Sequence, residues 1–204
     1  ILDGAFTAEG VQGGVIGALI QGFRRAAFSN EAGLGSAAIA HSTVRTREPV
    51  TEGFVALWEP FIDTVVICTM TALVIVISGQ LDALAGSALG GTAQGVALTS
   101  KAFASAVWGF PYVLTVVVFL FAFSTIITWG YYGAKAASFL ANESKVVLYG
   151  FKLFFLAMAV VGATMNLGSI VDIADALMFI MAIPNLIGVY LLMPAVKREL
   201  ASYE

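Results

Sequence analysis

Three polar residues interrupt an otherwise apolar segment near the start of the chain. Ser29, Asn30 and Glu31 stand shortly before two glycines, Gly33 and Gly35. Hydroxyl, amide and carboxylate groups in this pattern bind ions or the charged ends of a small solute where the backbone around them is not helical. The alternative is a turn at the membrane surface, with the glycines serving only helix packing. The residue types therefore leave a buried binding site and an interfacial turn both open.

A second polar set follows one face of a later apolar segment. Its members recur with helical spacing, and they are Ser124, Thr125, Thr128, Trp129 and Tyr132. Sodium prefers oxygen ligands, so the three hydroxyl groups are candidate ligands together with backbone carbonyls, and Trp129 is a candidate to close over a small side chain. Alternatively, the hydroxyl groups bond to the preceding helical turn and the aromatic rings anchor at the membrane interface.

A carboxylate, Asp63, shares a helical face with Thr64, Cys68 and Thr71. An acidic side chain within a bilayer is a candidate to balance a cation or to bind a proton. Because Asp63 follows Pro60 closely, we favour a structural role, in which its carboxylate begins a helix.

The composition of the whole chain excludes several classes of protein. Of its 204 residues 59% are hydrophobic and 11% are charged, whereas a soluble domain carries about 25% charged residues. An integral membrane protein is therefore predicted. The 10 Lys and Arg residues are too few for a nucleic-acid binder, and one Cys and one His exclude a disulfide framework and a zinc or haem site. An intramembrane hydrolase with Ser29 or Ser124 as nucleophile and His41 as base lacks an orienting acid, so an enzyme is not expected.

Four segments reach the length of about 20 apolar residues that a bilayer crossing needs. They are 61–79, 108–132, 147–167 and 171–194. The region of about 11–44 is interrupted and is expected to be a broken helix, whose free carbonyl and amide ends suit a cation and an anion. Within it, Arg24 and Arg25 are expected to face a wet vestibule or to pair with Glu31. The linker 80–107 is expected to be an outer loop, with its apolar end forming either a short helix or irregular chain.

Basic residues accumulate in alternate linkers, which predicts the orientation in the membrane. The second linker contains Lys101 and the fourth contains no basic residue, whereas the other linkers and the tail hold Arg45, Arg47, Lys135, Lys145, Lys197 and Arg198. We therefore expect the first crossing to run inward and the C-terminus to be cytoplasmic. His41, beside the first basic linker, is expected to be interfacial rather than a proton relay.

The last predicted span carries polar residues at its start and a proline in its middle. Asp172 and Asp175 are expected to cap the outer end of the helix or to line a vestibule. Pro184 is expected to kink the helix, with Asn185 satisfying the carbonyl that the proline leaves free.

The chain is identified as resembling the alanine/glycine:cation symporters, also called sodium:alanine symporters. The resemblance rests on the run Gly22 to Ser36, which reads GFRRAAFSNEAGLGS, and on two later runs, FIDT from Phe61 and FST from Phe123 with WGYYG from Trp129. It implies an all-α integral membrane protein that forms the second five-helix repeat, with a broken first helix, of a leucine-transporter-like inverted-repeat fold. The chain begins without an initiator Met, so we expect it to be a piece of a longer protein. The resemblance implies that residues 1–204 are the C-terminal part of a transporter core whose N-terminal repeat is absent.

The function implied by this resemblance is sodium-coupled symport of alanine or glycine across a prokaryotic inner (plasma) membrane. Sodium is then the transported coupling ion rather than a resident cofactor, and the partners are a small neutral amino acid, the lipid bilayer and the missing repeat. The implied substrate-binding residues are Phe28, Ser29, Asn30, Ala32, Gly33, Thr125 and Trp129, the sodium ligands are Ser124, Thr125 and Thr128, and the possible ion or gating residues are Asp63 and Glu31. The alternatives are an ion channel, a proton-coupled amino-acid transporter and a structural membrane subunit.

Overall fold

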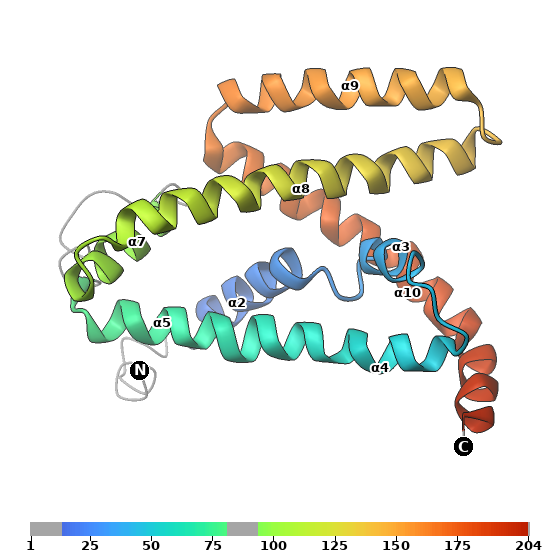
Figure 1. The fold of residues 1–204 in the computed structure, drawn as a ribbon, viewed down its shortest axis with the longest axis horizontal. Coiled ribbons are helices and arrows are strands. Elements are labelled where there is room, and N and C mark those ends of the chain that lie inside the picture. Colours follow the sequence, from blue (N-terminus) through green and yellow to red (C-terminus); the bar gives the residue numbers. More distant parts are fainter. Residues whose placement is uncertain (1–13, 81–93, 204) are drawn as a thin grey trace. The chain divides into compact units, whose positions relative to one another are not determined.

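In the computed structural model, which describes residues 14–80 and 94–203, every regular element is a helix (Figure 1). The helices in chain order are α2 (Val15–Asn30), α3 (Ser36–His41), α4 (Pro49–Pro60), the π-helical η2 (Phe61–Ile67), α5 (Cys68–Ile77), α7 (Gln94–Ala106), α8 (Phe110–Leu140), α9 (Lys145–Thr164) and α10 (Leu167–Ser202). The apolar end of the predicted outer loop is thus helical, as α7. The rest of that loop from 81 to 93 lies outside the described residues, as do the first residues of the region 11–44.

The chain divides into two compact units, each with its own internal packing. The first unit contains the residues up to Ile67 and those from Ala174 onward, and therefore holds α2, α3, α4, η2 and most of α10. The second unit, Cys68–Ile173, holds α5, α7, α8 and α9. The interrupted helix belongs to the first unit, and the polar face of α8 belongs to the second.

Four helices in the described residues are long and apolar enough to cross a membrane. They are Pro49–Ile77, which joins α4, η2 and α5, then Phe110–Leu140, Lys145–Thr164 and Leu167–Ser202. Each of them overlaps one predicted span. Large apolar side chains on these helices are exposed, and the buried apolar residues of the described chain are Leu34, Ala102, Ala134 and Met178. So small an apolar core is expected where lipid rather than water surrounds the helices.

The first long helix begins well before the start predicted at residue 61. Pro49 occupies its first turn, where the missing N–H costs no hydrogen bond, and Glu52 lies in the same turn. Pro60, which we expected to precede the helix, lies inside it and is followed directly by η2. A proline inside a helix removes one backbone hydrogen bond and clashes with the carbonyl four residues before it, and the π-helical segment directly after Pro60 marks a local change in the helical geometry. The helix therefore continues through Pro60 instead of starting after it.

The predicted interruption lies between α2 and α3. Glu31 ends α2 in the left-handed conformation with φ of 56°, and its N–H donates to the carbonyl of Ala27. Gly33 and Gly35 also have positive φ values, of 83° and 95°. Glycine adopts this conformation without the strain that a Cβ atom causes, so the two glycines permit the chain to leave one helix and enter the next within a few residues.

Candidate solute and ion site at the interrupted helix

The end of α2 is tied to η2 by two neighbouring hydrogen bonds. Ser29 Oγ donates to Asp63 Oδ2 at 2.5 Å, and Asn30 Nδ2 donates to Thr64 Oγ1 at 2.8 Å. Thr64 Oγ1 also lies 3.5 Å from Asp63 Oδ2. The polar residues predicted from the two segments therefore come together, and Thr64, which was not among the predicted site residues, belongs to the same group.

The predicted structural role of Asp63 at the beginning of a helix is wrong. Asp63 lies within the continuous helix Pro49–Ile77, on the π-helical segment η2, and its carboxylate accepts the hydrogen bond from Ser29. The prediction failed because it treated Pro60 as the start of the helix. π-helical turns occur frequently at functional sites because they re-aim side chains and loosen the backbone ladder.

Asn30 organises the first residues of the break. Its Oδ1 accepts the backbone N–H of Ala32 at 2.9 Å while its Nδ2 donates to Thr64. An asparagine that bonds to the backbone two residues ahead forms a local turn, which competes with helix continuation. The same side chain thus helps to end α2 and to attach it to η2.

The glycine-containing part of the break is held by α10. Asn185 Nδ2 donates to the carbonyl of Gly33 at 2.8 Å, and a Cβ atom added to Gly35 would lie 3.2 Å from Asn185 Oδ1. We expected Asn185 to satisfy the carbonyl freed by Pro184, and that prediction is wrong, since its amide instead reaches the break. The sequence gives no signal for this contact, because 152 positions separate the two residues.

An ion pair joins α2 to α10 one turn before the break. The guanidinium of Arg25 donates to the Asp175 carboxylate, whose residue is 6% exposed, and lies 5.7 Å from the centre of the Phe28 ring. Arg25 thus has a partner other than the predicted Glu31. Asp175 lies within α10 and pairs with Arg25 of α2, rather than capping the start of α10. A buried carboxylate without a cation would be costly, so each group compensates the other.

Ser36, at the start of α3, has a buried hydroxyl group without a hydrogen-bond partner. The residue is 1% exposed, and within the described chain its Oγ is a buried side-chain oxygen that no protein atom satisfies. Leaving such a group unpaired costs about 1–3 kcal/mol. Ser36 was not among the predicted site residues, although it closes the run that carries the family resemblance.

His41 connects the end of α3 to α4. Its Nδ1 lies 2.7 Å from Glu52 Oε1 and its Nε2 lies 3.2 Å from Glu59 Oε2. His41 lies outside the four membrane-length helices. The hydrogen bond to Glu52 raises the pKa of His41, burial opposes this shift, and the charge of Glu59 adds to it. Two carboxylates facing both ring nitrogens favour the imidazolium form, which donates from both.

The polar face of α8 lies in the second unit. Ser124 Oγ donates to the Phe121 carbonyl and Thr128 Oγ1 donates to the Ser124 carbonyl, each at 2.9 Å. The rings of Trp129 and Tyr132 meet edge to face, with centroids 6.0 Å apart, and Thr125 lies on the same helix. The backbone bonds use the hydroxyl protons and leave oxygen lone pairs for a cation, so they are compatible with both predicted roles.

Polar groups gathered around an interrupted helix, among helices of membrane-spanning length, are typical of membrane proteins that handle ions or polar solutes at membrane depth. A sequence model described as the sodium:alanine symporter family matches residues 1–204, and the chain belongs to this family. The predicted family resemblance is thereby confirmed.

Curated relatives agree with this assignment. The chain is 38% identical over its whole length to the sodium/alanine symporter AgcS of Methanococcus maripaludis, covering 44% of that protein. It is 39% identical, again over its whole length, to the probable sodium/glutamine symporter GlnT of Bacillus subtilis, covering 41% of it. The chain thus spans less than half the length of these relatives, which are transporters and not enzymes. No solved structure matches the chain.

Proposed function

We propose that this chain supplies part of a sodium-coupled symporter for a small neutral amino acid, alanine or glycine. The observation that carries the proposal is the break between α2 and α3, where non-helical backbone lies beside the hydroxyl, amide and carboxylate groups of α2 and η2. At such a break, peptide groups that neither the helices nor side chains satisfy can bind a polar solute or an ion. The unsatisfied hydroxyl of Ser36 directly after the break supports a polar ligand there.

The proposal assigns roles to residues of the break in the first unit and to residues of α8 in the second unit. Residues of the break and of α8 bind the amino acid, and they are Phe28, Ser29, Asn30, Ala32, Gly33, Thr125 and Trp129. The sodium ligands are the hydroxyl groups of Ser124, Thr125 and Thr128. Asp63 and Glu31 act in ion binding or gating, and the short contact between Asp63 and Ser29 supports a role for that carboxylate beside the solute.

The chain forms the second repeat of a leucine-transporter-like fold in this proposal. Its length, less than half that of the relatives, supports a missing first repeat that completes the site. The alternation of basic linkers supports an inner-membrane protein with a cytoplasmic C-terminus. Transport follows from rocking of the helices about a site near the middle of the bilayer.

Sodium entry supplies the driving force. One sodium ion that moves down an inside-negative potential of 100 mV releases about 2.3 kcal/mol, enough for an approximately fiftyfold gradient of the amino acid. Coupling requires that the ion and the amino acid each stabilise the same closed state, so that neither one alone carries the transporter across.

The test is uptake of labelled alanine into proteoliposomes that contain a transporter of full family length carrying this chain. An inward sodium gradient is compared with choline, in the parent and in Ser124→Ala and Thr125→Ala. We expect saturable, sodium-dependent accumulation, and about a tenfold higher half-saturating sodium concentration in each variant, because each loses an ion ligand. Thr115→Ala is the matched control, since Thr115 bonds to the Pro111 carbonyl on the same helix, outside the proposed site.

The alternatives give different results in this assay. Accumulation that follows a proton gradient and ignores sodium would establish a proton-coupled carrier; one relative, YrbD of Bacillus subtilis, is described as a putative sodium/proton-dependent alanine carrier. Ion current without solute accumulation would establish a channel. Competition by unlabelled glutamine tests the solute class named for GlnT.

A further inference from the structure

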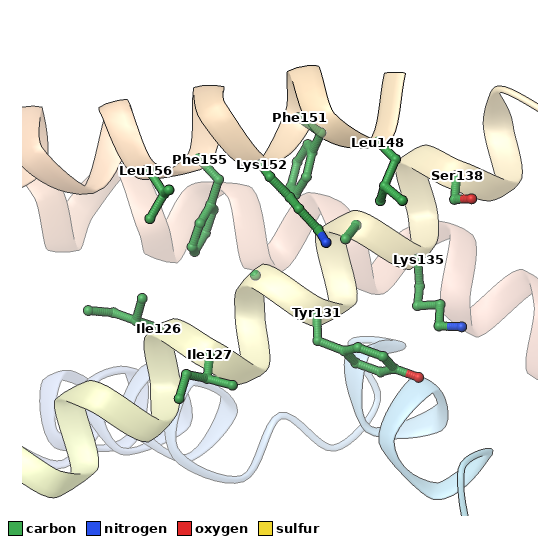
Figure 2. A pocket seen from close by; sticks show the side chains of 12 residues that line it. Ile126, Ile127, Tyr131, Lys135, Ser138, Leu148, Phe151, Lys152, Phe155 and Leu156 are labelled. Atoms are coloured by element: carbon green, nitrogen blue, oxygen red, sulfur yellow. The ribbon is translucent and has the colours of Figure 1, made fainter. Parts of the chain in front are cut away.

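The second unit contains a groove between α8 and α9 that the transport site does not use. The two helices form a hairpin joined by residues 141–144, and the groove between them has a volume of about 560 Å³. Figure 2 shows its walls, with Phe151 and Phe155 reaching from α9 toward α8 and Ile126, Ile127 and Tyr131 opposite. The volume lies within the range of roughly 300–1,000 Å³ typical of small-molecule sites.

Glycines on α8 give the groove its shape. A Cβ atom at Gly133 would lie 2.2 Å from the Phe151 ring, so the helices approach each other at this point in a way that only glycine permits. A Cβ atom at Gly130 would lie 3.2 Å from the Phe155 ring. The two phenylalanine rings stack with centroids 6.1 Å apart, and they present a continuous apolar wall.

Two lysines line the groove, one from each helix. Lys135 is five residues before the end of α8 and Lys152 is seven residues after the start of α9, which places both about 7–11 Å from the turn that joins the helices. Their ammonium groups lie 5.5 and 5.8 Å from the centres of the Tyr131 and Tyr149 rings. In Figure 2 Lys152 extends between the two helices, and Lys135 lies beside Tyr131.

No acidic side chain lines the groove beside these lysines. The residues that line the groove include no Asp or Glu, and among the described residues neither lysine forms an ion pair. A charged side chain at this depth of a membrane is unfavourable unless it reaches the headgroup region or finds an anion. Within the described residues, the groove therefore combines two lysines that have no carboxylate partner with apolar walls.

We propose that the groove binds an anionic phospholipid of the surrounding leaflet, with its phosphate between Lys135 and Lys152 and an acyl chain along the phenylalanine wall. Basic pockets between membrane helices bind such headgroups. A free phosphate would leave the apolar wall uncovered. A zwitterionic lipid would bring its own positive charge to the two lysines. An anionic lipid matches both parts of the groove.

The test uses native mass spectrometry of a detergent-purified transporter of full family length that carries this chain, titrated with phosphatidylglycerol. Each lysine near an anionic headgroup is worth about fivefold in affinity, so Lys135→Gln with Lys152→Gln is expected to weaken binding about thirtyfold. The matched control is Lys145→Gln with Lys197→Gln, which removes the same charge from residues that do not line the groove and is expected to weaken binding much less. The paired Lys→Arg variant keeps both charges and is expected to retain the lipid.

Three results would overturn the proposal. Phosphatidylcholine binding as tightly as phosphatidylglycerol would show an apolar groove without headgroup recognition. Displacement of the lipid by millimolar inorganic phosphate would show an anion site without an acyl chain. Equal weakening by the groove pair and the control pair would show general attraction to the basic side of the protein.

Discussion

At the scale of single residues, the break between α2 and α3 is defined by side chains that find partners and by one that does not. Ser29, Asn30 and Asn185 all bond to other elements or to the break itself. The hydroxyl of Ser36 is more deeply buried than these three side chains but has no protein partner in the described chain. Its unsatisfied hydrogen-bonding capacity is most simply met by a ligand or an ordered water.

Replacement of Ser36 by Ala tests whether the partner of its hydroxyl is the ligand. We expect Ser36→Ala to leave thermal stability unchanged or to raise it by about 1 kcal/mol, because a buried unpaired hydroxyl is removed. We also expect the KM for alanine to rise several-fold, since the ligand loses a partner. Thermal unfolding in detergent and uptake kinetics measure the two effects. An unchanged KM with raised stability would mean that Ser36 faces no ligand.

Gly35 is the residue whose replacement should damage the break most. Its φ of 95° strains any other residue, and an added Cβ atom would press against Asn185 Oδ1. We expect Gly35→Ala to lower stability by about 1–3 kcal/mol. The double variant with Asn185→Ala should recover only the steric part, whereas full recovery would show that the backbone conformation carries no cost. Gly53→Ala on α4 is the control, because a Cβ atom there meets nothing.

The residue types of the break were predictable, but their partners were not. A polar run before two glycines in an apolar segment indicates an interrupted helix, because few other structures accommodate it. The bonds from Asn185 to Gly33 and from Arg25 to Asp175 span 152 and 150 positions. Such pairs depend on how distant helices pack, and no local pattern in the sequence encodes that packing.

At the scale of the elements, four long apolar helices overlap the four predicted spans, while several of their ends differ from the predicted ones. All four predicted spans lie on long apolar helices, since about 20 apolar residues are a strong local signal. The first helix starts at Pro49 rather than near residue 61, because η2 allows it to pass Pro60. The last helix continues through both Pro184 and Pro194. Prolines are weak boundary signals where neighbouring backbone adjusts around them.

The link between α3 and α4 should be sensitive to pH. Glu52 and Glu59 are the charged groups that face His41 in the described residues, and they raise its pKa above the ordinary value of 6.5. A raised pKa in the folded state means that His41 stabilises the protein fully below pH 6.5, and that this contribution is lost as the pH rises through the folded-state pKa. We therefore expect the parent protein to lose thermal stability relative to His41→Gln as the pH rises above 6.5.

The two glutamates provide controls for this pH dependence. Glu52→Gln should remove most of the difference, because the hydrogen bond to Glu52 is the largest cause of the raised pKa. Glu59→Gln should remove less, since its carboxylate is farther from the ring and more exposed. Parallel pH profiles for the parent and His41→Gln would show that the protonation of His41 does not affect stability.

At the scale of the whole molecule, charge placement predicts the orientation of the chain in the membrane. The basic residues flanking the helices favour the cytoplasmic side, because moving them across the bilayer is unfavourable during insertion. Lys101 on α7 falls in the linker that the alternation assigns to the outside, and the tail with Lys197 and Arg198 is assigned to the inside. These assignments follow from the sequence and do not require the packing of the helices.

Single cysteines, one on α7 and one at the end of α10, test the orientation in a transporter of full family length. In a background with Cys68→Ala, Lys101→Cys and Ser202→Cys place thiols at exposed residues of α7 and of the end of α10. We expect a membrane-impermeant maleimide to label Lys101→Cys in right-side-out vesicles and Ser202→Cys only in inside-out vesicles. Labelling of both positions from one side would mean that they lie on the same side of the membrane. The charges instead predict that an odd number of crossings separates them. Inverted labelling would mean that charges outside this chain dominate its insertion, because the first helices of a membrane protein usually have the largest influence on its topology.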